Sequence, residues 1–141
     1  KPWMEWTPFQ EQIDAADIAD RVHLFLEYIP DERLPIFFSA ADLVVLPYTH
    51  FDAQSAVGAR AISYRRPMIV SSVGGLPDWV GGDPHWIVPP EDPGTLAVRL
   101  NIFLSQPEAE TRTFDAVVDT VLANTDWNHI ATRHLEIYGR M

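Results

Sequence analysis

Residues 66–78 read RPMIVSSVGGLPD, an apolar run followed almost directly by paired glycines. A second uninterrupted run, LVVLP, occupies residues 43–47 and ends at a proline. Continuous apolar runs of this length are typical of strands that are covered on both faces, as the strands of parallel sheets are. Between the two runs, residues 54–64 are rich in alanine and contain no proline, which predicts a helix. The centre of the chain therefore reads as strand, helix, strand.

The same alternation continues on both sides of this centre. Before the centre, the sequence predicts a helix over 9–19, a strand over 21–26 and a helix opened by Asp31. After it, the sequence predicts a short helix ending at Val80, a strand over 85–88, helices over 95–104 and 113–123, and a last helix. Asp92 and Pro93 are expected to start the helix over 95–104, and Asp126 is expected to cap the last one. Alternation of this kind gives right-handed crossovers and a parallel sheet with helices on both faces. We therefore predict an α/β fold, a Rossmann-like doubly wound parallel sheet.

Composition limits the classes of function. The chain has 141 residues, 47% of them hydrophobic, which suffices for one core, so we expect a single domain over residues 1–141. The net charge of −10 disfavours nucleic acid as a partner, although backbone amides can still hold a small anion. The lack of cysteine excludes disulfides and thiolate chemistry and fits a reducing compartment, so we expect a cytoplasmic location.

Ligands of parallel α/β sheets bind outside the carboxyl ends of the strands. This rule points to three loops, at residues 47–53, 71–77 and 88–92. The first loop leads into the helix that begins near Ser55, and a helix start offers unpaired amides and a positive dipole end to a diphosphate. The alternative, equally compatible with the sequence, is that Ser55 or Asp52 only caps this helix.

The second loop carries Gly74 and Gly75. Paired glycines permit a positive φ and a close approach of the backbone to a ligand, but they also suit a tight turn into the next helix. His50 in the first loop could act as a base or donate a hydrogen bond to a phosphate. A loop histidine that is merely exposed, without such a role, is the commoner case. The sequence has no Ser-His-Asp order, no metal-ligand spacing and no phosphate loop of the Gly-Lys-Ser/Thr type.

Several segments, in the right order, resemble family 4 glycosyltransferases of the GT-B fold. They are VHLFLEYIPDERLP at 22–35, AADLVVLP at 40–47, RPMIVSSVGGLPD at 66–78, VPPEDP at 88–93 and the closing helix with Trp127, Ile130 and Tyr138. The resemblance runs from about residue 15 to the end of the chain. One block alone would be weak, but their order makes the resemblance specific.

The resemblance implies a domain that binds a nucleoside diphosphate sugar and transfers the sugar with retention of configuration. It implies neither a covalent cofactor nor an essential metal. Gln54, Ser55 and Ala56 would present backbone amides to the diphosphate, and Gly74 and Gly75 would shape the loop beside the sugar.

The family's paired glutamates fall on Asp52 and Arg60 in this sequence. Asp52 keeps an acid with a shorter side chain, so it remains a candidate ligand residue. Arg60 reverses the charge at the position that usually holds the ribose, and this contact does not carry over.

The resemblance further implies that the chain is the C-terminal, donor-binding half, without its first strands and without the N-terminal acceptor domain. A sheet that lacks strands exposes an unpaired edge, so we expect self-association through that edge. We also expect that these 141 residues alone are inactive.

Two other classes of function compete with a transferase. Arg60 motivates a degenerate, non-catalytic domain of the same fold that acts as a binding or scaffold module. An acidic signalling domain of the receiver type is disfavoured, because no acidic cluster ends the first strand and no lysine ends a late one.

Overall fold

The computed structural model describes residues 5–139. The chain forms two compact units that divide between Leu34 and Pro35. The predicted single domain stays a prediction.

The first unit contains helix α1, Thr7–Ala15, and a 3-10 turn η1, Ala19–Arg21. The predicted strand over residues 21–26 is wrong, because the backbone after Arg21 is irregular and Leu24, Phe25 and Leu26 are 41%, 49% and 70% exposed. Apolar alternation favours a strand only where a neighbouring strand and a covered face stabilise it. Residues 21–26 pair with no strand in the described part of the chain.

The second unit is built on a parallel three-stranded sheet with strands β1, Val44–Leu46, β2, Met68–Ser71, and β3, Ile87–Val88. Their order in the sheet is β1-β2-β3. All four residues of β2 are buried, as expected for the central strand of a sheet covered on both faces. The two apolar runs thus predicted β1 and β2. The strand predicted over 85–88 is shorter in the structure, because His85 and Trp86 belong to a 3-10 turn.

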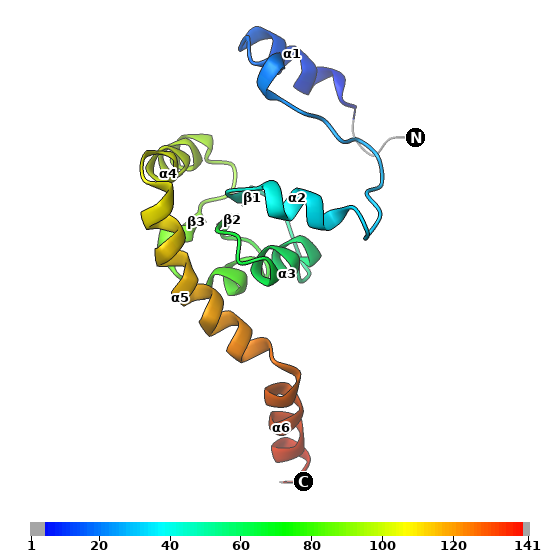
Figure 1. Ribbon diagram of the computed structural model, residues 1–141, viewed down its shortest axis with the longest axis vertical. Coiled ribbons are helices and arrows are strands. Elements are labelled where there is room, and N and C mark those ends of the chain that lie inside the picture. Colours follow the sequence, from blue (N-terminus) through cyan, green and yellow to red (C-terminus); the bar gives the residue numbers. More distant parts are fainter. Residues whose placement is uncertain (1–4, 140–141) are drawn as a thin grey trace. The chain divides into compact units, whose positions relative to one another are not determined.

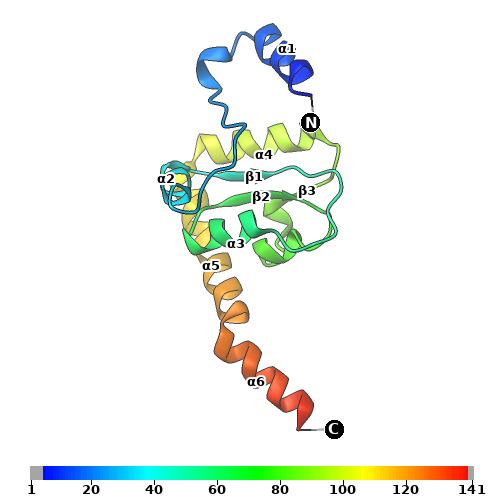
Figure 2. The same ribbon diagram turned by 90° about the vertical axis from the view of Figure 1, so that its right-hand side faces the viewer.

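Helices cover both faces of this sheet. Helix α3, Ala56–Ser63, lies on one face and α4, Pro93–Ser105, lies on the other (Figure 2). Helix α5, Pro107–Thr125, packs against both α3 and α4 (Figure 1). The remaining elements are α2 (Leu34–Ala40), the 3-10 turns η2 (Pro77–Val80) and η3 (Pro84–Trp86), and α6 (Trp127–Tyr138).

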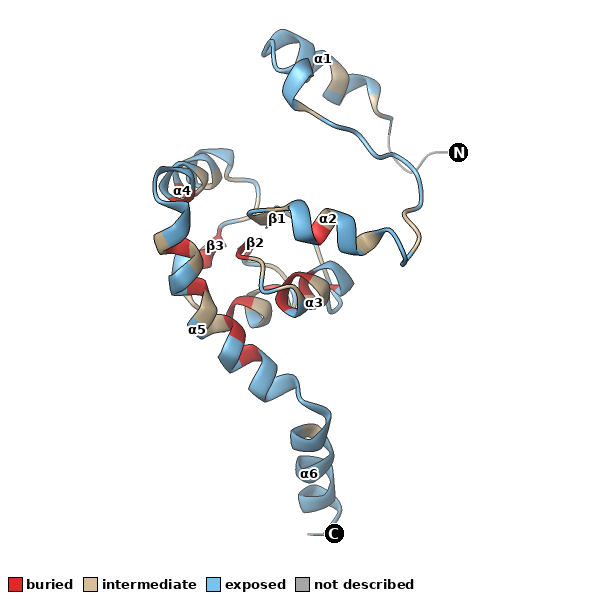
Figure 3. Ribbon diagram, in the orientation of Figure 1, coloured by how far each residue is buried: buried red, intermediate tan, exposed pale blue. Residues whose placement is uncertain are grey.

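The core lies between the sheet and α3, α4 and α5, where the buried residues of Figure 3 gather. Its largest fully buried side chains include Met68, Ile69, Trp86, Phe103 and Phe114. The predicted caps of α4 and α6 are confirmed: Asp92 accepts a hydrogen bond from the backbone amide of Thr95, and Asp126 from that of Asn128. The helix expected from Asp31 begins later, at Leu34, and α5 begins earlier than expected, at Pro107.

A buried ion pair joins the C-terminal helices to the end of the sheet. Arg99 of α4 donates to the carboxylate of Glu110 of α5, and both side chains are less than a tenth exposed. Arg99 also donates to the carbonyl oxygen of His85, and its guanidinium lies 4.4 Å from the centre of the Trp86 ring. His85 Nε2 lies 2.9 Å from the Glu110 carboxylate, so this histidine belongs to the same cluster.

Candidate functional site

A cavity of about 150 Å³ opens at the carboxyl ends of the strands. All three loops that the sequence singled out contribute to it. Its lining residues are Pro47, Thr49, Ser71, Val88, Pro89, Glu91, Asp92, Pro93 and Leu96. The cavity lies where open α/β sheets bind their ligands, and it is the candidate functional site.

The third loop supplies the two carboxylates of the cavity. Asp92 caps α4: its side chain accepts from the Thr95 hydroxyl at 2.6 Å and from the Thr95 amide at 2.9 Å. These hydrogen bonds, the hydroxyl one first, hold the pKa of Asp92 below its ordinary value. Glu91 adopts φ +57°, a left-handed conformation that is uncommon for residues other than glycine. Its exposed side chain forms no ion pair with any residue that the structure describes.

The predicted phosphate-binding residues lie at the start of α3. Ser55 is 4% exposed and caps the helix, accepting a hydrogen bond of 3.0 Å from the amide of Gly58. The capping interpretation of Ser55 is therefore correct for its side chain. The first-turn amides of Ala56 and Val57 donate to no group in the described part of the chain, so a ligand can still use them.

Gly74 and Gly75 allow another group to approach their backbone closely. In the structure this group is not a ligand but another loop of the same chain. Gly74 has φ +51°, and a Cβ atom there would overlap the carbonyl oxygen of Phe51. A Cβ atom on Gly75 would lie 2.5 Å from the amide nitrogen of the Gln54 side chain. The glycine pair therefore lets the loops after β1 and β2 pack together.

Asp52 lies outside the cavity, on the exposed part of the first loop. Its carboxylate lies 2.9 Å from His50 Nε2, and both side chains are 82% exposed. Gln54 contributes to a different cavity of about 400 Å³, which Asp78, Trp79, Val121 and Thr125 complete. Of the six predicted site residues, Asp52, Gly74 and Gly75 lie in the loops that the sequence singled out. Gln54, Ser55 and Ala56 lie at the start of α3, and none of the six lines the cavity at the strand ends.

Sequence reasoning selected the three loops but did not single out Thr49, Ser71 or Glu91 within them. The rule on strand ends could have found Ser71, because it is the last residue of a buried strand. Nothing in the sequence marks Glu91, since the left-handed backbone of a residue other than glycine leaves no compositional signal.

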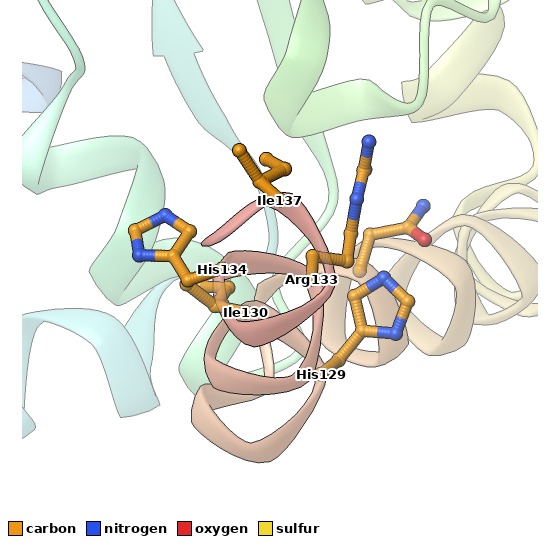
Figure 4. Close-up of a pocket in the computed structure, with 6 residues that line it drawn as sticks. His129, Ile130, Arg133, His134 and Ile137 are labelled. Carbon is orange, nitrogen blue, oxygen red and sulfur yellow. The ribbon is translucent and has the colours of Figure 1, made fainter. Parts of the chain in front are cut away.

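A further groove of about 310 Å³ lies along α6 and the last turn of α5 (Figure 4). Its lining residues are Asn124, His129, Ile130, Arg133, His134 and Ile137. Of these only Ile130 is half-buried and the others are exposed. All six lie on helices rather than at strand ends, so this groove is not the candidate site.

Within residues 5–139, no three histidine, cysteine or carboxylate side chains come together as metal ligands would. Among the helices that the structure describes, none combines the length and apolar character needed to span a bilayer.

The fold and the position of the cavity are those of the α/β proteins whose ligands bind at the carboxyl ends of parallel strands. The family model described as Glycosyl transferases group 1 matches residues 4–106, more than half of the chain. The chain therefore belongs to the group 1 glycosyltransferases.

Relatives and a solved structure agree with this family. The chain is 29% identical over 114 residues to 2-deoxystreptamine N-acetyl-D-glucosaminyltransferase from Streptomyces fradiae, covering 80% of the chain and 27% of that protein. It is 25% identical over 109 residues to the putative teichuronic acid biosynthesis glycosyltransferase TuaC from Bacillus subtilis, covering 77% and 28%. Sucrose-phosphate synthase from Thermosynechococcus elongatus superposes with a TM-score of 0.75 at 28% identity, covering 95% of this chain and 33% of that one.

The likeness to sucrose-phosphate synthase confirms the predicted α/β fold with a parallel sheet and its assignment to the GT-B type. Helices on both faces agree with a doubly wound sheet. The three described strands lie side by side in the same order as in the sequence. The reversal of strand order that characterises a doubly wound sheet therefore does not occur among them. The chain spans about a third or less of the length of these similar proteins.

Proposed function

We propose that this chain forms the donor-binding part of a family 4 glycosyltransferase, which transfers a sugar from a nucleoside diphosphate sugar to an acceptor with retention of configuration. The observation that carries this proposal is the pair of free amides at the start of α3, the helix that follows the carboxyl end of β1 in a group 1 glycosyltransferase domain. Transfer by these 141 residues alone is not expected, since the chain spans about a third or less of the length of the similar glycosyltransferases.

The diphosphate binds at the start of α3 in this proposal. The unpaired amides of Ala56 and Val57 are donors, and the positive end of the helix dipole favours a negative group there. Stabilising the leaving diphosphate is the main electrostatic contribution that such a site makes to the transition state. No organic cofactor or metal takes part, and the reaction takes place in the cytoplasm.

A non-catalytic binding module is the second candidate. The observation that favours it is Arg60, which replaces an acid at the position that the family resemblance assigns to the ribose. A module of this kind would keep the fold but bind no nucleotide.

Chemical-shift mapping with UDP, GDP and ADP separates these functions. A donor site predicts saturable shifts of the Ala56 and Val57 amides with one of the three nucleotides. A binding module predicts no saturable shift at these amides with any of them, and this result would overturn the proposal.

The unpaired edge of β1 is expected to mediate self-association. In the described residues β1 pairs only with β2, and the amide of Val44 donates to Pro67 on that side at 2.9 Å. Because successive amides of a strand point to opposite edges, the amide of Val45 faces the unpaired edge. Sedimentation velocity should show a concentration-dependent dimer or larger species.

Val45→Pro should shift this equilibrium towards monomer, because it removes an edge amide without removing the bond between Val44 and β2. Circular dichroism and thermal melting verify that the variant folds. A wild-type chain that stays monomeric at every concentration would contradict the expected edge pairing.

A further inference from the structure

The walls of the cavity at the strand ends differ in chemistry. Three prolines, Val88 and Leu96 form an apolar wall. Thr49, Ser71 and Glu91 supply hydroxyl and carboxylate groups from three different loops. A site that combines an apolar wall with a few convergent polar groups is typical of small-molecule recognition.

The Ser71 hydroxyl is the buried polar group of this cavity. Ser71 is 1% exposed, and its hydroxyl donates to the carbonyl oxygen of Leu46 at 3.4 Å, near the upper limit for a hydrogen bond. It accepts no hydrogen bond from any residue that the structure describes. A buried hydroxyl with unused acceptor capacity is ready to accept a hydrogen bond from a ligand.

The Glu91 carboxylate gives the cavity its charge. It forms no ion pair in the described part of the chain, and Asp92 beside it is engaged in capping α4. An ionised carboxylate only accepts hydrogen bonds, so it favours ligands rich in hydroxyl or ammonium donors. The same charge repels a ligand that carries a carboxylate of its own.

We propose that this cavity takes one ring of a neutral or amino sugar, with Glu91 and Ser71 accepting hydrogen bonds from the ring, and that it rejects sugars that carry a carboxylate. Hydroxyl groups of the ring meet the polar wall, and its C–H face meets the prolines. The inference deepens the proposed function and rests on it, since it names the class of sugar that the transferase handles.

Methyl glycosides test the cavity without any knowledge of the nucleotide. Methyl glucoside, methyl N-acetylglucosaminide and methyl glucosaminide should shift the amides of Thr49, Ser71 and Glu91. Methyl glucuronide should bind at least about tenfold more weakly, because its carboxylate faces Glu91. Glu91→Gln should largely abolish this difference, since it removes the charge and keeps the shape of the side chain.

Glu91→Gly is the matched folding control, because glycine adopts φ +57° without strain. It should fold at least as stably as the wild type and bind the neutral glycosides more weakly. Equal binding of glucoside and glucuronide by the wild type, or no shift at these three amides with any glycoside, would overturn the inference.

A competition experiment with the sugar nucleotide tells whether the bound ring belongs to the donor or to the acceptor. If the ring belongs to the donor, the nucleotide sugar competes with methyl glucoside, whereas an acceptor ring allows both to bind at once. The two proposals also fail separately. Nucleotide shifts at Ala56 without glycoside shifts would refute only the sugar cavity, and glycoside shifts without nucleotide shifts would refute only the nucleotide site.

Discussion

Glu110→Gln is expected to lower the free energy of unfolding by about 3 kcal/mol at neutral pH. The substitution leaves the Arg99 guanidinium buried without a compensating charge, and a buried unpaired cation is strongly destabilising. It also weakens the contact of Glu110 with His85, which joins η3 to α5. Denaturant unfolding followed by circular dichroism measures the change.

Asp119→Asn is the matched control, since it also neutralises an acid of α5 that pairs with an arginine. The pair of Asp119 with Arg65 is exposed, with side chains 71% and 46% exposed, so its loss should change the free energy of unfolding far less than Glu110→Gln does. Similar losses in the two variants would contradict a structural role of the buried pair.

The effect of Glu110→Gln should depend on pH. Burial raises the pKa of Glu110, but the hydrogen bonds from His85 and Arg99 outweigh burial and hold the pKa below its ordinary value of 4.5. A carboxyl group with a depressed pKa in the folded state stabilises the fold above the pKa of the unfolded state, and this stabilisation is lost as the pH falls through the folded-state pKa. The difference between wild type and variant should therefore shrink at pH values below 4.5.

Gly74→Ala is expected to destabilise the second unit by about 3 kcal/mol. A left-handed alanine accounts for roughly 1 kcal/mol of this, and the overlap of its methyl group with the Phe51 carbonyl forces the two loops apart. Because these loops carry Gln54 and the start of α3, nucleotide binding should weaken as well.

Gly82→Ala separates the cost of a left-handed backbone from the cost of steric overlap at Gly74. Gly82 has φ +70°, but a Cβ atom there would meet nothing within 4 Å, so this variant should lose only about 1 kcal/mol. Thermal melting of both variants gives the comparison. If Gly74→Ala melts at the same temperature as Gly82→Ala, the contact between the loops after β1 and β2 contributes nothing to stability.

The strands of the second unit could be predicted because each is a short apolar run that ends in proline or polar residues. The caps at Asp92 and Asp126 could be predicted because capping depends on a few neighbouring residues. The strand over residues 21–26 could not be judged from its own pattern, since a strand needs a partner and the described residues provide none.

The site was predictable at the level of loops but not of individual side chains. Parallel topology places the ends of β1, β2 and β3 together, so the three loops had to meet. Which side chains line the cavity depends on the backbone of each loop, and the left-handed Glu91 and the packing of Gly74 on Phe51 are tertiary features. The capping by Ser55 was one of two interpretations, and the sequence alone could not choose between them.

Calorimetric titration of Ser55→Asp and Ser55→Asn with UDP, GDP and ADP tests the nucleotide site most directly. Both substitutions keep a good helix cap and have the same size, so they differ only in the charge next to the free amides of α3. We predict that one nucleotide saturates the wild type, and that Ser55→Asp binds it at least about tenfold more weakly than Ser55→Asn, because its carboxylate repels the diphosphate. Equal affinities of the two variants, or no binding of any nucleotide by the wild type, would contradict a donor site at the start of α3.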